Sequence, residues 1–259
     1  MFPTLFGGTA FRVPTWDVCL LAGAIIALII TIIKRPKIFP LSRIGIFLCG
    51  IFMIYMGLLG SKLLFITLHW QTLQTAGYPS LKYMFQRAGY ASLGALGFEL
   101  LAIVIFTKFR TKRVSFLKVA DYYAPFIILQ MIFVRIGCLS YGCCYGKPTN
   151  LPWAIAFKTM PPPVVPSHPT QAYSIIFLAI IFFLMRHIYK KNQVPGVILF
   201  GTFCIYGFLR FFVELLRVDS IVIWQWLTLS QITMLSLSLI SLLCLFTVLL
   251  LNRKYRKSV

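Results

Sequence analysis

The chain has 259 residues, of which 59% are hydrophobic and only 12% are charged, whereas about a quarter of the residues in an ordinary soluble domain are charged. This composition excludes a water-soluble fold. The net charge of +20 comes from 25 Lys and Arg residues against five acidic residues. Because the basic residues lie in short runs between long apolar stretches, they indicate membrane topology and not a nucleic-acid partner.

Seven apolar stretches are long enough to cross a bilayer, which requires about 20 mostly apolar residues. In chain order they cover residues 17–33, 44–68, 90–107, 119–138, 171–188, 195–217 and 229–251. The first stretch ends in a Lys-Arg-Pro-Lys run and not at a small-residue cleavage site, so we expect it to remain as a membrane span. The short connections and the uniform composition predict one all-α transmembrane domain over residues 1–259.

Basic residues are concentrated in one set of alternate connections between these stretches. That set, at residues 34–43, 108–118, 186–191 and 253–257, holds 16 of them, and the opposite set holds five. The five are Arg12, Lys82, Arg87, Lys147 and Lys158. Because short cytoplasmic loops are enriched in Lys and Arg, this imbalance predicts an external N-terminus and a cytoplasmic C-terminus.

Four further cations, Lys62, Arg135, Arg210 and Arg217, lie within or at the outer ends of the apolar stretches. A charge at the centre of a bilayer costs about 3 kcal/mol on insertion scales, so such residues need a partner or a function. At about 1.5 Å per residue, the first three lie roughly 27, 25 and 22 Å from the cytoplasmic starts of their helices. We therefore expect three helices to bring cations to one level in the outer half of the membrane, where they form an anion site.

Glu214 lies between two of these cations on the same predicted helix. Arg210, Glu214 and Arg217 follow i, i+4, i+7 spacing, which places them on one helix face and lets Glu214 pair with both arginines. The alternative interpretation is that Arg217 and Lys62 extend to the outer interface and that Glu214 only neutralises Arg210.

The segment at residues 134–148, VRIGCLSYGCCYGKP, is the most unusual part of the sequence. Its glycines Gly137, Gly142 and Gly146 permit close backbone approach or positive φ, which suits a loop that folds back around a ligand at the membrane surface. A second polar run, SHPTQAY, follows at residues 167–173.

Taken together, three runs resemble the prolipoprotein diacylglyceryl transferase family over most of the chain. The family's Arg-Ile-Gly run and following Gly-rich segment are matched by Arg135, Ile136, Gly137, Gly142 and Gly146. Its His-Pro-x-Gln-x-Tyr run is matched by His168, Pro169, Gln171 and Tyr173. Its Tyr-Gly-x-x-Arg-x-x-x-Glu-x-x-Arg run is matched by Tyr206, Gly207, Arg210, Glu214 and Arg217. Lys62 stands where the family usually has a basic residue.

The resemblance implies an enzyme that moves a diacylglyceryl group from phosphatidylglycerol to the lipobox cysteine of a prolipoprotein signal peptide, forming a thioether and releasing glycerol phosphate. It implies a bacterial cytoplasmic (inner) membrane location, an active site facing the outer leaflet, membrane lipids and signal peptides as partners, and no cofactor. Arg135, Arg210 and His168 become the expected catalytic residues. The expected substrate-binding residues are Arg135, Gly137, Gly142, Gly146, Gln171, Tyr173, Tyr206, Glu214, Arg217 and Lys62.

The chain departs from the family pattern where the third span commonly carries a His before paired glycines, because it has Leu93 and a single glycine there. His168 is then the candidate base or substrate-orienting residue, and the alternative is a structural cap that holds its loop to Tyr173. Asp17 and Glu99 are further candidate bases. The departure predicts either a divergent branch of the family or a relative with altered activity, such as a different acceptor.

Cys138, Cys143, Cys144 and His168 form an alternative metal or redox constellation. The spacing is not Cys-x-x-Cys and adjacent cysteines chelate one metal awkwardly, so we predict no metal site. Two other functions are considered. A transporter would need a polar path through the inner half of the bilayer, and a membrane thiol oxidoreductase would use Cys143 and Cys144.

Overall fold

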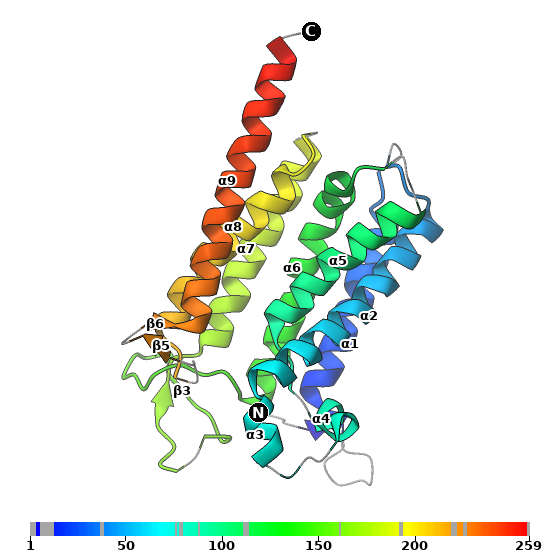
Figure 1. Ribbon diagram of the computed structural model, residues 1–259. Coiled ribbons are helices and arrows are strands. Elements are labelled where there is room, and N and C mark those ends of the chain that lie inside the picture. The colour runs from blue at the N-terminus through cyan, green and yellow to red at the C-terminus, as the bar shows by residue number, and fades with distance from the viewer. Residues whose placement is uncertain are drawn as a thin grey trace. The chain divides into compact units, whose positions relative to one another are not determined.

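The computed structural model describes residues 4–5, 13–36, 39–75, 77, 80–87, 89–110, 114–160, 162–191, 194–218, 222–224 and 227–257. These residues include seven helices that are long and apolar enough to cross a membrane (Figure 1). They are α1 (Thr15–Ile33), α2 (Arg43–Leu68), α5 (Ser92–Arg110), α6 (Phe116–Tyr141), α7 (Thr170–Lys191), α8 (Val197–Leu215) and α9 (Leu229–Lys257).

Each apolar stretch expected from the sequence coincides with one of these helices. The all-α fold of a multi-pass membrane protein is therefore confirmed. The largest difference in bounds is at α9, which continues beyond the apolar stretch to Lys257, because its basic end still has good helix formers. The orientation of the termini stays a prediction, and Arg12 lies outside the described residues.

Eight short elements among the described residues were not predicted from the hydropathy pattern, which detects only long apolar segments. Two are helices, α3 (Trp70–Thr75) and α4 (Leu81–Arg87). The others form antiparallel pairs. These are β1 (Thr4–Leu5) with β2 (Val13–Pro14), β3 (Ile155–Ala156) with β4 (Pro166–Ser167), and β5 (Val222–Trp224) with β6 (Leu227–Thr228).

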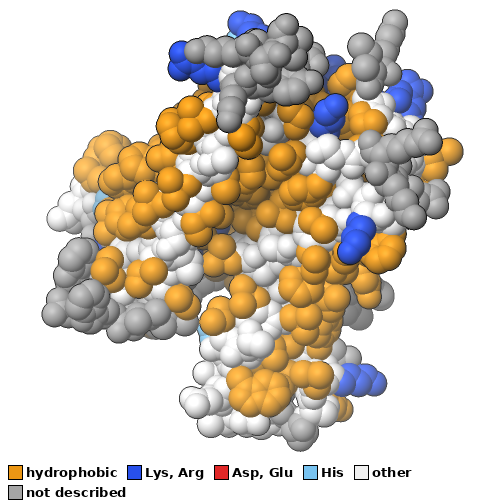
Figure 2. Space-filling model, turned by 45° about the horizontal axis from the view of Figure 1, so that its top comes forward, with side chains coloured by type: hydrophobic (Ala, Val, Ile, Leu, Met, Phe, Trp, Pro, Cys, Tyr) orange, Lys and Arg blue, Asp and Glu red, His pale blue; other side chains and the backbone are white. Residues whose placement is uncertain are grey.

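Large apolar side chains are exposed along the long helices. Ile44, Phe183 and Leu243 are examples from three of them. Hydrophobic side chains also cover much of the face seen in Figure 2. Helices that are apolar on their outer faces as well as their packed faces require an apolar solvent, so this surface is the one that lipid would cover.

The described backbone groups into two compact units. One unit comprises Ile30–Ala120, and the other comprises Met1–Ile29 together with Asp121–Val259. In the Ile30–Ala120 unit, α2 packs on α5 at two glycines: a Cβ added to Gly94 would lie 2.3 Å from the carbonyl oxygen of Gly60. In the other unit, α8 packs on both α7 and α9. That all 259 residues form a single domain stays a prediction.

Asp121 joins α6 to the start of α8. Its Oδ2 accepts a hydrogen bond from the Gly196 backbone N–H at 2.7 Å, and its Oδ1 accepts one from the Leu199 N–H at 2.8 Å. The carboxylate thereby satisfies two of the N–H groups that the first turn of a helix leaves without partners. Arg135 follows Asp121 by 14 residues (121 to 135) and Arg210 follows Gly196 by 14 residues (196 to 210), so the two arginines reach the same level.

Replacing Asp121 by Ala removes the acceptor for both N–H groups in a buried position. We expect Asp121→Ala to lower the free energy of unfolding by about 1–3 kcal/mol, the usual cost of buried unsatisfied groups. Asp121→Asn keeps one acceptor oxygen and serves as the control, with a smaller loss. Unfolding in mixed detergent micelles measures the difference, and an unchanged stability of Asp121→Ala would show that the tie contributes nothing.

Candidate active site

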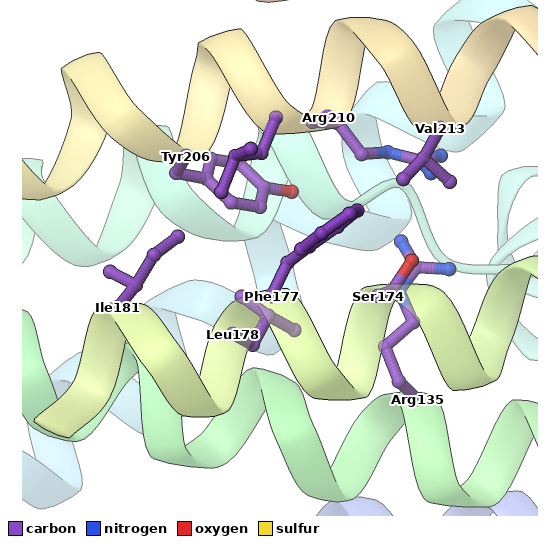
Figure 3. Close-up of a pocket in the computed structure, with 9 residues that line it drawn as sticks. Arg135, Ser174, Phe177, Leu178, Ile181, Tyr206, Arg210 and Val213 are labelled. Carbon is purple, nitrogen blue, oxygen red and sulfur yellow. The ribbon is translucent and has the colours of Figure 1, made fainter.

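Arg135 and Arg210 line one pocket in the unit that contains α6, α7 and α8. Figure 3 shows Arg135 reaching up from α6 and Arg210 coming from α8, with their guanidinium groups in the same space and Ser174 of α7 beside Arg135. The remaining lining residues are one tyrosine and apolar side chains of α7 and α8. They are Tyr206, Phe177, Leu178, Ile181, Leu209 and Val213.

The pocket carries an excess of positive charge. Arg135 is 9% exposed and Arg210 is 8% exposed, so both guanidinium groups are largely removed from solvent. Glu214 Oε2 lies 2.6 Å from Arg210 Nη2 and 3.7 Å from Arg217 Nη1. The predicted pairing of Glu214 with both arginines is thus confirmed. Three arginines and one glutamate leave this group with more positive than negative charge, which suits an anionic ligand.

Tyr206 adds a polar group to the same pocket. Its hydroxyl is buried and has no hydrogen-bond partner among the residues that the structure describes. Burying a hydroxyl without a hydrogen-bond partner costs free energy, so a ligand that enters the pocket would gain by forming a hydrogen bond with it. Ser174, in contrast, already donates a hydrogen bond to the Thr170 carbonyl at 2.8 Å.

The loop after α6 is held in an uncommon backbone conformation. Gly142 has φ 87° and Cys144 has φ 64°, both in the left-handed region. Three side chains donate hydrogen bonds to successive carbonyls of this loop: Thr159 to Gly142, Gln171 to Cys143, and Thr170 to Cys144. Gln171, which was expected to bind substrate, therefore uses its amide nitrogen to stabilise the conformation of the loop.

Gly146 brings the three sequence runs together. Its N–H donates to the His168 carbonyl at 2.9 Å, and the Lys147 N–H donates to the Leu216 carbonyl at 2.7 Å. A Cβ on Gly146 would lie 2.7 Å from both His168 Cβ and the Leu216 oxygen. Only glycine fits between the segments before α7 and after α8, so this residue allows the loop to close over the ends of both helices.

His168 and Tyr173 form a small polar group of their own. His168 Nδ1 lies 3.2 Å from the Tyr173 hydroxyl, which accepts a hydrogen bond from Trp153 Nε1 at 2.7 Å. Within the described part of the chain, His168 does not line the arginine pocket. Its contacts support the structural interpretation, in which it fixes the loop to Tyr173. A role for His168 as base stays a prediction.

The other expected residues lie in varied surroundings. Gly137 faces α1, where an added Cβ would lie 3.2 Å from Trp16 Cα. Lys62 belongs to the Ile30–Ala120 unit, where its Nζ donates to the Phe85 carbonyl at 2.9 Å and lies over the rings of Phe85 and Tyr90. Its sharing of a site with the arginines stays a prediction. Glu99 is buried against Gly57 within the same unit as Lys62.

Three cysteines cluster at the end of α6. The Sγ atoms of Cys138, Cys143 and Cys144 all lie within 4.8 Å of one another, and none of the three is in a disulfide bond. Hydrogen bonds with Cys138 and Cys143, aided by the charges of Arg135 and Arg217, lower the pKa of Cys144. His168 is not part of this cluster among the described residues, so the alternative constellation of three cysteines and one histidine does not form as a whole.

Ser174 and the apolar side chains that line the pocket with it were not predicted from the sequence. A signal was present, because Gln171, Ser174, Leu178 and Ile181 recur at helical spacing and form one buried face of α7. The role of Asp121 as a cap for α8 was not predicted, because it depends on a residue 75 positions away in the sequence.

Comparison with known proteins decides the family. Residues 3–248 match the family described as Prolipoprotein diacylglyceryl transferase. The chain belongs to this family. A Phosphatidylglycerol--prolipoprotein diacylglyceryl transferase of Clostridium tetani is 32% identical over 221 residues, which cover 85% of this chain and 86% of that protein. The protein named Phosphatidylglycerol--prolipoprotein diacylglyceryl transferase 2 of Clostridium perfringens is 36% identical over 63% of each chain.

Family membership confirms the resemblance found in the three sequence runs, and it makes the chain a member of a transferase family. The runs that carry that resemblance meet in the structure at one place. Arg135 and the loop of Gly142 and Gly146 come from the first run, and Arg210 comes from the last. The middle run supplies the side chains that hold the loop.

Glu214→Gln removes the negative charge that both Arg210 and Arg217 contact. Because breaking a buried ion pair leaves uncompensated charge, we expect a loss of about 3–5 kcal/mol in the free energy of unfolding. Arg217→Gln is the comparison, since the longer distance of 3.7 Å and the greater exposure of its side chain, 14% against 8% for Arg210, predict a smaller loss. Unfolding in mixed micelles ranks the two variants, and equal losses would contradict this assignment of the ion pairs.

Proposed function

We propose that this membrane enzyme transfers a diacylglyceryl group from phosphatidylglycerol to the thiol of a lipobox cysteine in a prolipoprotein. The proposal is supported by membership of the transferase family and by the names of its relatives, which specify phosphatidylglycerol and a prolipoprotein. The observation that carries it is the buried pair of arginines facing one pocket, since the reaction releases a phosphate ester.

The chemistry needs a stabilised leaving group. The acceptor thiolate forms a sulfur–carbon bond to the glyceryl carbon while the carbon–oxygen bond to phosphate breaks. The bonding electrons go to the phosphate oxygen, so glycerol phosphate leaves with an additional negative charge. Guanidinium groups of Arg135 and Arg210, already fixed and shielded from solvent, stabilise that charge in the transition state. The Tyr206 hydroxyl donates a further hydrogen bond to the phosphate.

The apolar part of the pocket suits the rest of the donor lipid. Phe177, Leu178 and Ile181 follow Ser174 along α7, so an acyl chain can extend along the helix from the arginine end. Ile181 lies seven residues beyond Ser174 (174 to 181), or about 10 Å at helical rise. This arrangement of cations at one end and an apolar wall at the other matches a phospholipid, whose headgroup and chains differ in the same way. The same arrangement argues against a transport function, because a transport path would need polar groups along the apolar wall.

The acceptor thiol must lose its proton, because the thiolate is the nucleophile. The cationic surroundings of Arg135, Arg210 and Arg217 favour the thiolate of a cysteine that approaches the pocket. We propose His168 as the base or as a residue that orients the substrate. It lies in the segment before α7 and fixes that segment to Tyr173. Leu93 replaces the family's usual histidine in the third span, so a different acceptor is the alternative to the lipobox cysteine.

The proposed location is the bacterial cytoplasmic membrane, with the arginine pocket at the level of the outer leaflet. The support is the imbalance of basic residues between alternate connections, which assigns the end of α6 that bears Arg135 to the external side. Donor lipid in that leaflet reaches the pocket sideways from the bilayer, and a translocated signal peptide presents its cysteine at the same depth.

Arg135→Ala removes one of the two guanidinium groups that face the leaving phosphate. We expect the rate of transfer to fall about 100- to 1,000-fold or more, as when one preorganised transition-state donor is lost, while the protein still inserts. The assay supplies purified protein with phosphatidylglycerol and a lipobox peptide and detects the thioether product by mass spectrometry. Arg253→Ala, at the exposed end of α9, is the matched control and keeps full activity.

Arg135→Lys separates charge from geometry, because lysine keeps the charge but cannot form a two-pronged contact with phosphate. Activity between those of the wild type and Arg135→Ala is expected. Wild-type activity in Arg135→Ala would reject the role of this residue. Absence of thioether product from the wild-type protein would reject the proposed reaction itself.

A further inference from the structure

The three-cysteine cluster has no place in the transfer reaction as described. Cys138 lies in the last turn of α6, and Cys143 and Cys144 lie in the loop that follows. Their sulfur atoms converge to within 4.8 Å of one another, and the cluster is partly to fully buried. The other four cysteines, Cys19, Cys49, Cys204 and Cys244, lie singly in membrane helices.

The spacing of the sulfur atoms suits a single ion. Three thiolates that each bind one cation at about 2.3 Å lie about 3.8–4.0 Å from one another, whether the arrangement is tetrahedral or trigonal. The observed upper limit of 4.8 Å differs from this by less than about 1 Å, a shift that side-chain rotation supplies. No change in the backbone is required to close the site.

The backbone conformation removes the objection that adjacent cysteines chelate one ion awkwardly. Cys144 has φ 64°, a left-handed conformation that is uncommon for a non-glycine residue and costs free energy. The Thr170 hydroxyl and the Gln171 amide hold the loop in that conformation through the carbonyls of Cys144 and Cys143. In this conformation both neighbouring thiols turn toward Cys138.

Surrounding groups support sulfur ligands. Trp16 Nε1 donates a hydrogen bond to Cys138 Sγ at 3.3 Å, the kind of outer contact that orients a metal ligand. Arg135 acts electrostatically on Cys138 and Cys144, and Arg217 acts on Cys144. Three thiolates with one bound monovalent or divalent cation keep a net negative charge, and the positive charges of Arg135 and Arg217 stabilise it.

We propose that Cys138, Cys143 and Cys144 form a binding site for one soft, thiophilic cation of the Cu(I) or Zn(II) class. Thiolate ligands select such cations over Mg²⁺ or Ca²⁺, which prefer oxygen. Arg135 lies one helical turn before Cys138 and also faces the phosphate pocket. An occupied site, which keeps net negative charge, therefore weakens the attraction of Arg135 for a phosphate. This consequence rests on the proposed transfer reaction, whereas the cation site does not.

Cadmium is a suitable probe because its thiolate complexes absorb in the ultraviolet. The reduced, detergent-solubilised full chain is titrated with Cd²⁺ under anaerobic conditions in the presence of a competing carboxylate chelator. We expect a cadmium–thiolate absorption band that saturates at one ion per chain. A variant with Ser at Cys19, Cys49, Cys204 and Cys244 retains only the cluster and is expected to bind equally.

Serine replacement at each cluster position is expected to weaken Cd²⁺ binding by more than the roughly 10- to 100-fold that loss of an outer contact costs. Gel filtration and thermal unfolding verify that each variant is folded. Failure of the wild type to bind in the presence of the chelator would overturn the proposal. Equal binding by a folded variant with all three cluster cysteines replaced would overturn it as well, since the ion would then lie elsewhere.

Coupling to the reaction is measured separately. With one Cd²⁺ bound per chain, the KM for phosphatidylglycerol is expected to rise at least about threefold in the variant that retains only the cluster, and to recover on chelation. An unchanged KM would reject the coupling but leave the cation site in place. If no preparation forms thioether product, the proposed reaction fails, and the binding titration still decides the cation site because it requires no turnover.

Discussion

The bond between Asp121 and the first turn of α8 is the constraint on which the site depends. It fixes the height of α8 relative to α6 at one end of the two helices. Since Arg135 and Arg210 stand equally far from this tie along their own helices, they meet at one level and enter the same pocket. A slip of one residue would move an arginine by about 1.5 Å along the axis and rotate it by roughly 100°.

Burying the arginines is costly, and the protein compensates only part of the cost. Glu214 neutralises one positive charge of the group, and the remainder stays directed at the pocket. An apolar membrane core would penalise this excess more than water does. This excess of positive charge therefore favours the binding of an anion, because α6 and α8 keep both guanidinium groups directed at the pocket. Preorganised charge of this kind suits the stabilisation of a leaving phosphate.

The loop after α6 connects the arginine pocket to the three-cysteine cluster. Gln171 and Thr170 use their polar atoms to hold the loop, and His168 is bound to Tyr173 beside it. Cys138, Cys143 and Cys144 lie at the end of α6 and in this loop, where their thiols converge. The three thiols therefore lie near Arg135, on a loop that the hydrogen bonds of Thr170 and Gln171 hold in place.

The sequence by itself determined the seven spans and the pairing of Glu214 with its two arginines, because apolar length and helical spacing are local properties of the chain. It also contained the three runs whose resemblance to the transferase family the comparisons confirmed. Only the tertiary structure decided that Arg135 and Arg210 share a pocket with Ser174, that Asp121 caps a helix 75 residues away, and that three thiols meet. Those features depend on contacts between distant segments and on the φ of Cys144, which no local pattern specifies.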